Sequence, residues 1–316
     1  MKGDICMNDY QVGVVIVTYN RLHLLSTALE AYDSQTKSPK YVLVIDNCST
    51  DGTKEYLDEW KTIPASYQKH VVHNNENKGG SGGFHDGLER TLTMDAEWIW
   101  IADDDAFPES NALENAQVFL SKVEKPFEEI AAICGAVINH GEPDLLHRRS
   151  EIQKGVVVQE TVAPAELYEK NCFEINCFSY VGTIINKEAL KKNGITDEKY
   201  YICYDDSEHS LRLREYGKIY CVPSIVVHHN VAAVASSFDW KTYYYYRNNL
   251  HMIKTHFPIQ CTVYLTMRNL ISGLSKLVIR AERQKGIVIL TATRDALLNR
   301  LGRHAVYKPG WKPEDQ

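Results

Sequence analysis

The sequence lacks the features that indicate a disulfide-stabilised or membrane-spanning protein. Its cysteines form no CxxC pair and most have apolar neighbours, which predicts reduced, buried thiols with no metal or redox role. The longest uncharged stretch, residues 221–238, contains Pro223, two histidines and Asn230, so it does not predict a membrane span. The first ten residues are polar and show no secretory signal, and we therefore expect a cytoplasmic protein. The eight cysteines are Cys6, Cys48, Cys134, Cys172, Cys177, Cys203, Cys221 and Cys261.

A dinucleotide-binding fingerprint is also missing. The glycine-rich segment Asn77–Phe84 (NKGGSGGF) does not have the GxGxxG spacing, and it follows the third predicted strand instead of the first. A Rossmann-type oxidoreductase is therefore not predicted.

The charge is distributed unevenly along the chain. With 44% hydrophobic and 24% charged residues, the composition is that of a globular protein with a sizeable core. Residues 241–316 carry 13 Lys/Arg against 4 Asp/Glu, and residues 1–240 carry 22 against 37, so the two parts have net charges of +9 and −15. The basic part is expected to meet an anionic membrane surface or a lipid-linked acceptor. A solvated helical face or a homo-oligomer interface is the alternative, and no nucleic-acid partner is expected.

Strands alternate with helices in the first hundred residues. Apolar runs of strand length occur at Gln11–Tyr19, Tyr41–Ile45, Lys69–His73 and Trp98–Ala102, and helical patterns follow the first three. This alternation predicts an α/β fold with a mainly parallel sheet flanked by helices. Ligands bind such sheets at the carboxyl ends of the strands, where Asn20, Asp46 and Asp103 fall.

The rest of the chain differs in pattern. Strand-like runs at residues 131–138, 179–185 and 219–227 are mixed with short helical segments, which predicts an α+β half. From Trp240 onward the chain is predicted to be helical. An aromatic cluster (residues 240–247) is followed by an apolar stripe with interspersed basic residues, as in a helix that lies on a bilayer. The stripe consists of Leu265, Leu270, Leu274 and Leu277, and the basic residues are Arg268, Lys276, Arg280 and Arg283.

Three consecutive aspartates, Asp103, Asp104 and Asp105, follow the apolar run at residue 98. Three carboxylates at the end of a buried strand repel one another unless a cation neutralises them. Hard oxygen ligands favour Mg²⁺ or Mn²⁺, which usually bridge carboxylates to substrate phosphates, so the triplet predicts a diphosphate-bearing substrate. The alternative is a solvated acidic turn.

Two further groups carry candidate chemistry. Asp205 and Asp206 precede a helical segment, and a carboxylate beside a second acid has a raised pKa, which suits a general base. The same acids would equally serve as a helix cap. His228 and His229 end a strand-like run, where an imidazole either adds a ligand to a metal such as Mn²⁺ or is structural.

Taken together, seven ordered motifs resemble the family 2 glycosyltransferases with the GT-A fold, and they span residues 12–230. They are most similar to bacterial galactofuranosyltransferases and rhamnosyltransferases of cell-surface polysaccharide synthesis. The motifs are VVIVTYNR (14–21), VIDNCSTDGT (44–53), NKGGSGGF (77–84), WIADDDA (100–106), FSYVG (178–182), YDDSEHSLR (204–212) and VVHHN (226–230).

The resemblance implies roles at the matching positions. Asp46 would accept a hydrogen bond from the uracil ring, Asp206 would be the catalytic base, and Asp104 would face the donor. His228 is the better match for the histidine that completes the metal site, with His229 as the alternative. Donor-binding residues would be Thr18, Asn20, Arg21, Asn77 and Gly80, and the metal ligands would be Asp103, Asp105 and His228.

The implied function is inverting, Mn²⁺- or Mg²⁺-dependent transfer of a sugar, galactofuranose from UDP-galactofuranose, to a glycan or lipid-linked glycan acceptor. The alternatives are a rhamnosyl- or pyranosyltransferase that uses another nucleotide sugar, and a non-catalytic glycan-binding or scaffold subunit. We expect a transferase domain at residues 1–240, with a nucleotide-sugar half at about 10–110 and an acceptor half at 111–240. A basic helical extension at 241–316 would follow, and the protein would be peripheral on the inner face of the plasma membrane.

Overall fold

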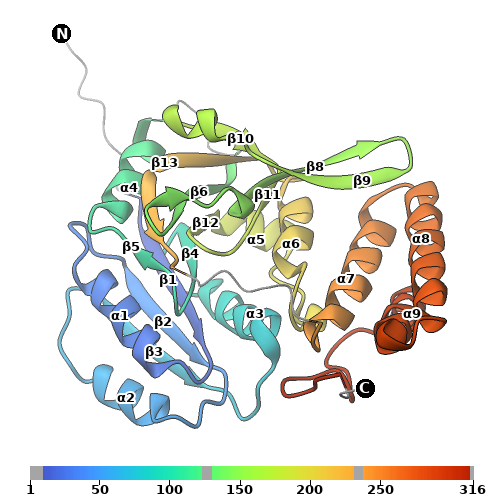
Figure 1. Cartoon of the computed structure of the whole chain (residues 1–316). Coiled ribbons are helices and arrows are strands. Elements are labelled where there is room, and N and C mark those ends of the chain that lie inside the picture. Colours follow the sequence, from blue (N-terminus) through green and yellow to red (C-terminus); the bar gives the residue numbers. More distant parts are fainter. Residues whose placement is uncertain (1–9, 123–129, 231–237, 314–316) are drawn as a thin grey trace.

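A ten-stranded sheet forms the centre of the molecule (Figure 1). The computed structural model describes residues 10–122, 130–230 and 238–313. Four parallel strands occur in the order β3-β2-β1-β4, and β12, β6, β13 and β10 continue the sheet beyond β4. The first four are β1 (Val12–Thr18), β2 (Tyr41–Asp46), β3 (Gln68–His73) and β4 (Trp98–Asp103). The others are β6 (Ile130–Asn139), β10 (Phe173–Ile175), β12 (Thr183–Asn186) and β13 (Lys218–His228), with β5 (Phe107–Pro108) on β13 and β7 (Glu142–Pro143) on β6.

Helices cover both faces of this sheet because the parallel strands are apolar on both sides. Along β1, Val14 and Ile16 pack into the cluster that contains the apolar faces of α1, α2 and α4, whereas Val15 and Val17 pack with α3 and α5. This alternation is the period of two that a strand imposes on its side chains. The predicted α/β fold is confirmed. The helices are α1 (Leu22–Asp33), α2 (Thr53–Trp60), α3 (Gly79–Thr91), α4 (Ala112–Lys122) and α5 (Lys187–Asn193).

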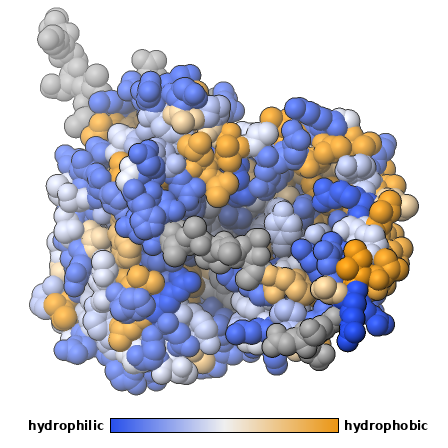
Figure 2. Space-filling view, viewed as in Figure 1, coloured by the Kyte–Doolittle hydropathy of each residue, from blue (hydrophilic) through white to orange (hydrophobic). Residues whose placement is uncertain are grey.

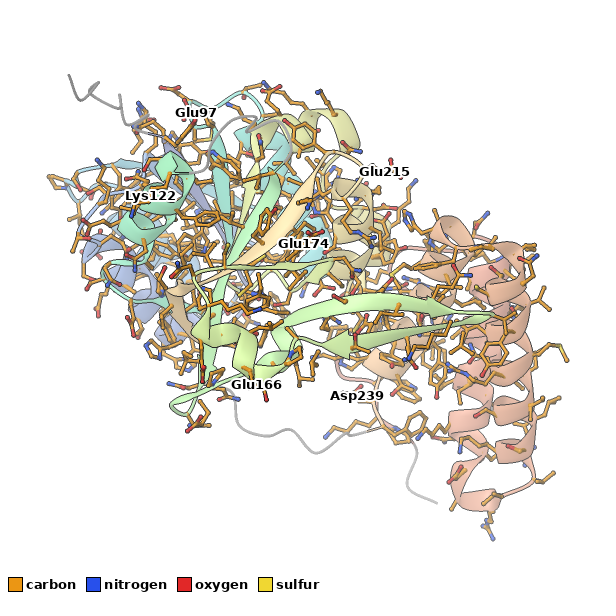
Figure 3. The ribbon with its side chains drawn as sticks, turned by 90° about the horizontal axis from the view of Figure 1, so that it is seen from above. Glu97, Lys122, Glu166, Glu174, Glu215 and Asp239 are labelled. Carbon is orange, nitrogen blue, oxygen red and sulfur yellow. The ribbon has the colours of Figure 1, made fainter. Side chains whose placement is uncertain are left out.

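A second, three-stranded sheet lies beside the first and was not predicted from the sequence. It has the order β11-β8-β9, with β8 (Arg148–Lys154) and β9 (Val157–Val162) forming a hairpin and β11 (Cys177–Phe178) at its edge. The hairpin extends from the body that contains the central sheet to the C-terminal helices (Figures 1 and 3). Helix α6 (Asp205–Leu213) packs against β11, so the sheet supports the segment that carries Asp205 and Asp206.

The C-terminal helices α7 (Lys241–His256), α8 (Ile259–Leu277) and α9 (Arg283–Leu297) pack against one another and against the body. Leu211 of α6 shares a buried cluster with Leu250 of α7 and Leu265 of α8. Helical structure beyond residue 240 is therefore as predicted. Among the described residues, no helix has both the length and the apolar character needed to cross a membrane.

The cysteines in the described part of the chain are free thiols. Four of the seven are buried and three are half-buried, and Cys6 lies outside the described residues. Burial raises the pKa of the Cys203 thiol to about 12, which makes it unreactive at neutral pH.

Candidate functional site

The candidate site lies at the carboxyl edge of the four parallel strands. Thr18 pairs with Asp46 across β1 and β2, and Val17 pairs with Asp103 across β1 and β4, so these three strands end side by side. A cleft of about 300 Å³ opens at this edge. The predicted site residues that line it are Thr18, Arg21, Asn77, Gly80, Asp103 and Asp104. Residues that the sequence did not indicate also line it, namely Tyr19, Asn47, Tyr201, Ile202, Trp240, Lys241 and Pro309.

The aspartate triplet is held together by Arg21. Its Nη1 lies 3.1 Å from Asp104 Oδ1 and 2.7 Å from Asp105 Oδ2. Thr18 Oγ1 donates a second hydrogen bond to Asp104 Oδ2 at 2.8 Å. The buried carboxylate of Asp104 thus has hydrogen-bond donors on both of its oxygens. Arg21 also supplies the positive charge that three adjacent carboxylates require.

The three carboxyl groups differ in pKa because their surroundings differ. Burial, followed by the charges of Asp105 and Asp104, raises the pKa of Asp103 to about 7. Burial also raises the pKa of Asp104, against the opposing effect of Arg21. For Asp105 the hydrogen bond and charge of His229, with that of Arg21, outweigh burial and lower the pKa. Asp103 is thus the carboxyl group whose ionisation most needs an added cation.

The two adjacent histidines point to different partners. His229 Nε2 lies 3.3 Å from Asp105 Oδ1, whereas His228 Nε2 lies 3.2 Å from Glu109 Oε1. Neighbouring residues of an extended chain direct their side chains to opposite faces, so only one of the pair can face the triplet. The choice of His228 from the sequence therefore does not agree with this geometry, which brings His229 to the triplet.

Asp103, Asp105 and His229 fit a divalent cation by the chemistry of their donor atoms. Two carboxylates and an imidazole suit Mn²⁺ or Mg²⁺. The charge of His229 opposes the rise in the pKa of Asp103, and the second ring nitrogen of His229, Nδ1, is buried without a hydrogen-bond partner among the described residues. Asp105 is held by Arg21 at 2.7 Å, so its carboxylate would have to turn from Arg21 to share one ion with Asp103.

The glycine-rich loop is shaped by Asn47, a residue that the sequence analysis did not single out. Asn47 Nδ2 donates to Asn77 Oδ1 at 3.2 Å and to the Gly79 carbonyl at 2.8 Å, and its Oδ1 accepts the Lys78 N–H. Gly79 has a φ of +75°, and a Cβ at this position would lie 2.1 Å from the Tyr201 carbonyl oxygen. The loop therefore requires glycine there, and it brings the backbone against Tyr201 at the cleft wall.

Two predicted donor-binding residues are not part of the cleft lining. Asp46 is buried, and its carboxylate accepts the Ser49 N–H at 2.9 Å and contacts His73 Nδ1 at 2.9 Å. Asn20 has a φ of 53°, and its Oδ1 accepts the Thr50 N–H at 2.7 Å. In this structure both side chains hold the loops that frame the cleft.

The paired acids of α6 have distinct environments. Asp205 is buried, and burial followed by the charge of Asp206 raises the pKa of Asp205 to about 7. Asp206 is more accessible, with 22% of its side chain exposed, and its Oδ2 lies 3.5 Å from Arg149 Nη2. Asp206 is therefore the more accessible acid of the pair. Arg149 escaped the sequence analysis because it lies on the unpredicted β8 strand.

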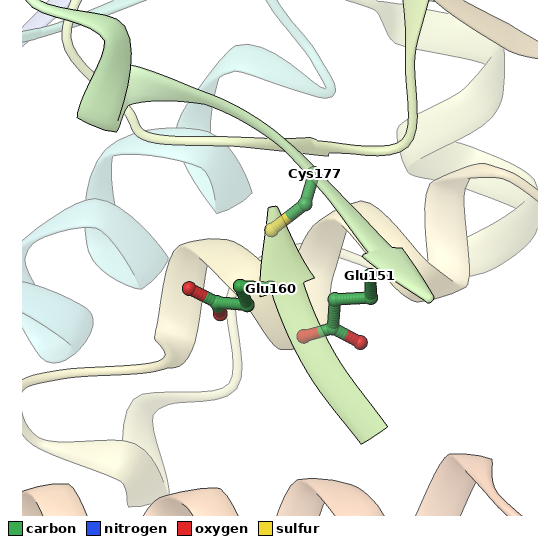
Figure 4. A group of neighbouring side chains, drawn as sticks. All are labelled: Glu151, Glu160 and Cys177. Atoms are coloured by element: carbon green, nitrogen blue, oxygen red, sulfur yellow. The ribbon is translucent and has the colours of Figure 1, made fainter. Parts of the chain in front are cut away.

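Arg149 connects Asp206 to a second acidic group on the hairpin. Arg149 Nη1 lies 2.7 Å from Glu160 Oε2. Glu160 and Glu151 come from β9 and β8, and with Cys177 of β11 they converge between neighbouring strands (Figure 4). Glu151 is buried, and its pKa is raised to about 7 by burial and then by the charge of Glu160. The guanidinium of Arg149 already supplies a positive charge here.

The loop before α6 is held in an unfavourable backbone conformation by α7. Tyr201, Cys203 and Tyr204 all have positive φ, at 66°, 67° and 64°, which costs free energy for bulky side chains. Asn248 Nδ2 donates to the carbonyl oxygens of Tyr200, Ile202 and Cys203 at 2.8–2.9 Å. The C-terminal helices therefore fix the loop that contacts the glycine-rich loop at Tyr201 and leads to Asp206. No local sequence pattern indicates this role of Asn248.

Comparisons with known proteins agree with this arrangement. The family model described as "Glycosyl transferase family 2" matches residues 13–194. A galactofuranosyltransferase of Mycolicibacterium smegmatis is 38% identical over 97 residues, which are 31% of this chain and 30% of that protein. A dTDP-rhamnosyl transferase of Shigella flexneri is 23% identical over 86% of this chain and 89% of that protein. The chain spans less than two thirds of the length of the curated galactofuranosyltransferases that it matches.

Among solved structures, the crystal structure of GalNAc-T7 with UDP, GalNAc and Mn²⁺ is similar to this chain. It has a TM-score of 0.61 and 17% sequence identity, and the match covers 78% of this chain and 48% of that one. At this identity the likeness establishes the GT-A fold.

Proposed function

The chain belongs to glycosyl transferase family 2, and on that premise we propose that it transfers galactofuranose from UDP-galactofuranose to a glycan acceptor. The aspartate triplet at the cleft is the observation that carries the proposal, because Asp103 and Asp104 line the cleft beside Arg21, and carboxylates next to a basic residue suit a diphosphate with its cation. The donor sugar is inferred from the similarity to the mycobacterial galactofuranosyltransferase.

The chain's own residues divide the work between donor and acceptor. Thr18, Arg21 and the glycine-rich loop would position the diphosphate. Asp103, Asp105 and His229 would hold a divalent cation, which would stabilise the charge on the departing UDP. Arg21 would be released from Asp105 when the cation is present and would then be available to a phosphate oxygen.

Asp206 would accept the proton of the attacking acceptor hydroxyl. Attack from the face opposite UDP inverts the anomeric carbon in one step, so no covalent intermediate with the protein is needed. Arg149, 3.5 Å from Asp206, would keep this carboxylate oriented between turnovers.

Two alternative functions remain to be compared by experiment. A rhamnosyl donor would use the same base and metal residues, and the similarity to the Shigella transferase supports this candidate. A non-catalytic glycan-binding subunit would bind acceptor without releasing a nucleotide.

A donor panel tests the proposal. We expect release of UDP from UDP-galactofuranose in Mn²⁺, less release from UDP-galactopyranose or dTDP-rhamnose, and loss of activity in excess EDTA. Asp103→Ala and Asp105→Ala should abolish transfer and weaken UDP binding in Mn²⁺. Preference for dTDP-rhamnose would establish the alternative donor, full activity in EDTA would refute the metal role, and no nucleotide release from any donor would favour the non-catalytic subunit.

The catalytic base is tested by a matched pair of variants. Asp206→Asn is expected to lower kcat by on the order of 10²–10⁴, the usual contribution of general acid–base catalysis, with UDP affinity nearly unchanged. Asp205→Asn should retain more activity, because Asp205 is buried and would serve the structure of α6. An active Asp206→Asn protein together with an inactive Asp205→Asn protein would transfer the role to Asp205.

A further inference from the structure

Helix α8 presents a continuous apolar stripe to solvent. Its side chains recur every three or four residues along the whole helix, which places them on one face. They are well exposed, with Ile271 at 64% and Val278, just after the helix, at 85%. We call this set the α8 stripe, and it consists of Ile259, Val263, Met267, Ile271, Leu274 and Val278. Hydrophobic side chains gather on the surface of the helical bundle (Figure 2).

The opposite face of α8 is occupied by the protein itself. Leu265 and Cys261 are buried in the cluster shared with α6 and α7, and Gly273 lies against Leu290 of α9. The apolar stripe that the sequence analysis placed at Leu265, Leu270, Leu274 and Leu277 is therefore wrong as an exposed surface, because its residues are divided between the core and the solvent. The spacing alone did not show which of two apolar faces of the helix packs inward.

The surroundings of the α8 stripe are basic. The exposed arginines are Arg268 on α8, Arg280 in the turn that follows it and Arg283 at the start of α9. Within described residues 241–313 the acidic side chains are Glu282 and Asp295, and both already contact basic groups of the same region: Glu282 pairs with Lys276, and Asp295 with Arg294. The acidic side chains of the bundle therefore do not neutralise the positive charge of the exposed arginines beside the stripe.

The β8–β9 hairpin packs against the face of α8 that is opposite the stripe. Val156 at its turn and Val162 on β9 are exposed, at 42% and 41%. Gly155, also in the turn, has its carbonyl oxygen 3.9 Å from the Cys261 Sγ of α8, and Figure 3 shows the hairpin reaching across to the helical bundle. The hairpin therefore connects α8 to the strand that carries Arg149, which contacts Asp206.

We propose that the α8 stripe inserts into the headgroup region of a bilayer that contains anionic lipids, with α8 parallel to the membrane plane. An apolar helical face flanked by arginines matches such a surface in both hydrophobicity and charge. A second copy of this chain is a poorer occupant, because a symmetric contact through the stripe would bring the arginines of one copy against those of the other. This inference goes beyond the proposed function, and vesicle binding can be measured without any nucleotide sugar.

Co-sedimentation with vesicles tests the proposal on the full chain. The protein should sediment with vesicles of phosphatidylcholine and phosphatidylglycerol at low salt, and much less with phosphatidylcholine alone or at high salt. The double variant Met267→Asp, Ile271→Asp should reduce the partition coefficient at least about tenfold, which corresponds to ~1.4 kcal/mol. Ile63→Asp is the control for each single substitution, Met267→Asp or Ile271→Asp, since it places one aspartate at an apolar site that is 53% exposed after α2.

A second variant separates charge from insertion and does not alter the stripe. Replacement of Arg268, Arg280 and Arg283 by glutamine should remove most of the preference for phosphatidylglycerol while leaving the melting temperature close to that of the parent. Undiminished binding by the aspartate double variant, or no sedimentation of the intact protein at low salt, would overturn the proposal. A stripe-dependent dimer in analytical ultracentrifugation, without vesicle binding, would overturn it in favour of a second copy.

Discussion

Replacement of Glu151 by glutamine should make the protein progressively more stable, relative to the parent, as the pH rises toward neutrality. Glu151 is 7% exposed, and neither of its carboxylate oxygens has a hydrogen-bond partner among the described residues. Burial, and then the charge of Glu160, raises the pKa of Glu151 from 4.5 to about 7, although Arg149 opposes the shift. The folded protein therefore favours the protonated side chain.

The direction of the effect follows from proton linkage. The unfolded chain releases this proton near pH 4.5, whereas the folded protein retains it until about pH 7. Below the lower value both states are protonated and Glu151 has no pH-dependent cost; above the upper value the folded state carries the full cost of a buried charge. A shift from 4.5 to about 7 corresponds to about 3 kcal/mol. Glutamine removes this term, and its unsatisfied amide adds a cost that does not change with pH.

Urea denaturation at a series of pH values measures this difference. The free energy of unfolding of Glu151→Gln, minus that of the parent, should increase by about 3 kcal/mol between acidic and neutral pH. Glu174→Gln is the control, because Glu174 is an exposed carboxylate on β10 (Figure 3) whose replacement should have a small effect at every pH. A difference that is constant with pH would refute the reasoning. A difference that decreases with pH would mean that the ionised form is stabilised, and its loss in EDTA would identify a cation at Glu151, Glu160 and Cys177.

Two further predictions concern the metal site and the loop before α6. In a titration of UDP affinity, His229→Ala should weaken Mn²⁺ binding at least about tenfold, whereas His228→Ala should change it little. The reason is that His229, and not His228, contacts the triplet. The reverse order would show that His228 is the ligand, as the sequence predicted. Asn248→Ala should lower the free energy of unfolding by about 2–5 kcal/mol, since buried carbonyl groups lose their donor, and should also lower kcat, whereas Asn249→Ala should do neither. A destabilised variant whose folded fraction retains the parental kcat would show that Asn248 has no part in positioning the base.

The first half of the fold was predictable because its parallel strands are continuous apolar runs that end in turn-forming or acidic residues. Trp98–Asp103 is an example: its apolar side chains are buried on both faces of the sheet, and the chain reaches the edge at Asp103. The β8–β9 hairpin was not predictable in the same way. Its strands, RRSEIQK and VVQETV, are largely polar and partly exposed, so they carry no strong period.

The site residues could be predicted as far as one strand end or one motif fixes them. Thr18, Arg21 and the aspartates follow directly from strands β1 and β4. The chain leaves β13 at the two adjacent histidines, and its direction there decides which of them faces the triplet. That direction depends on the register of β13 in the sheet, which the motif does not indicate. The contribution of Arg149 depends on the pairing of β8 with β11. Arg149 donates a hydrogen bond to the carbonyl oxygen of Phe178 on β11, and these two residues are 29 positions apart in the sequence. Such long-range contacts leave no local signal.

The C-terminal helices illustrate how a region that composition sets apart can contribute to the site by packing. Their excess of basic residues suggested an appended tail, yet Trp240, Lys241 and Pro309 line the cleft and Asn248 holds the loop that leads to Asp206. Truncation after α7 would expose the buried residues that α7 shares with α8 and α9, so loss of vesicle binding in a truncated protein would not distinguish a missing membrane contact from a disturbed fold. The inner face of the C-terminal helices therefore completes the site, whereas the exposed face of α8 is the proposed membrane contact. Membrane binding must be tested by point substitutions on that exposed face.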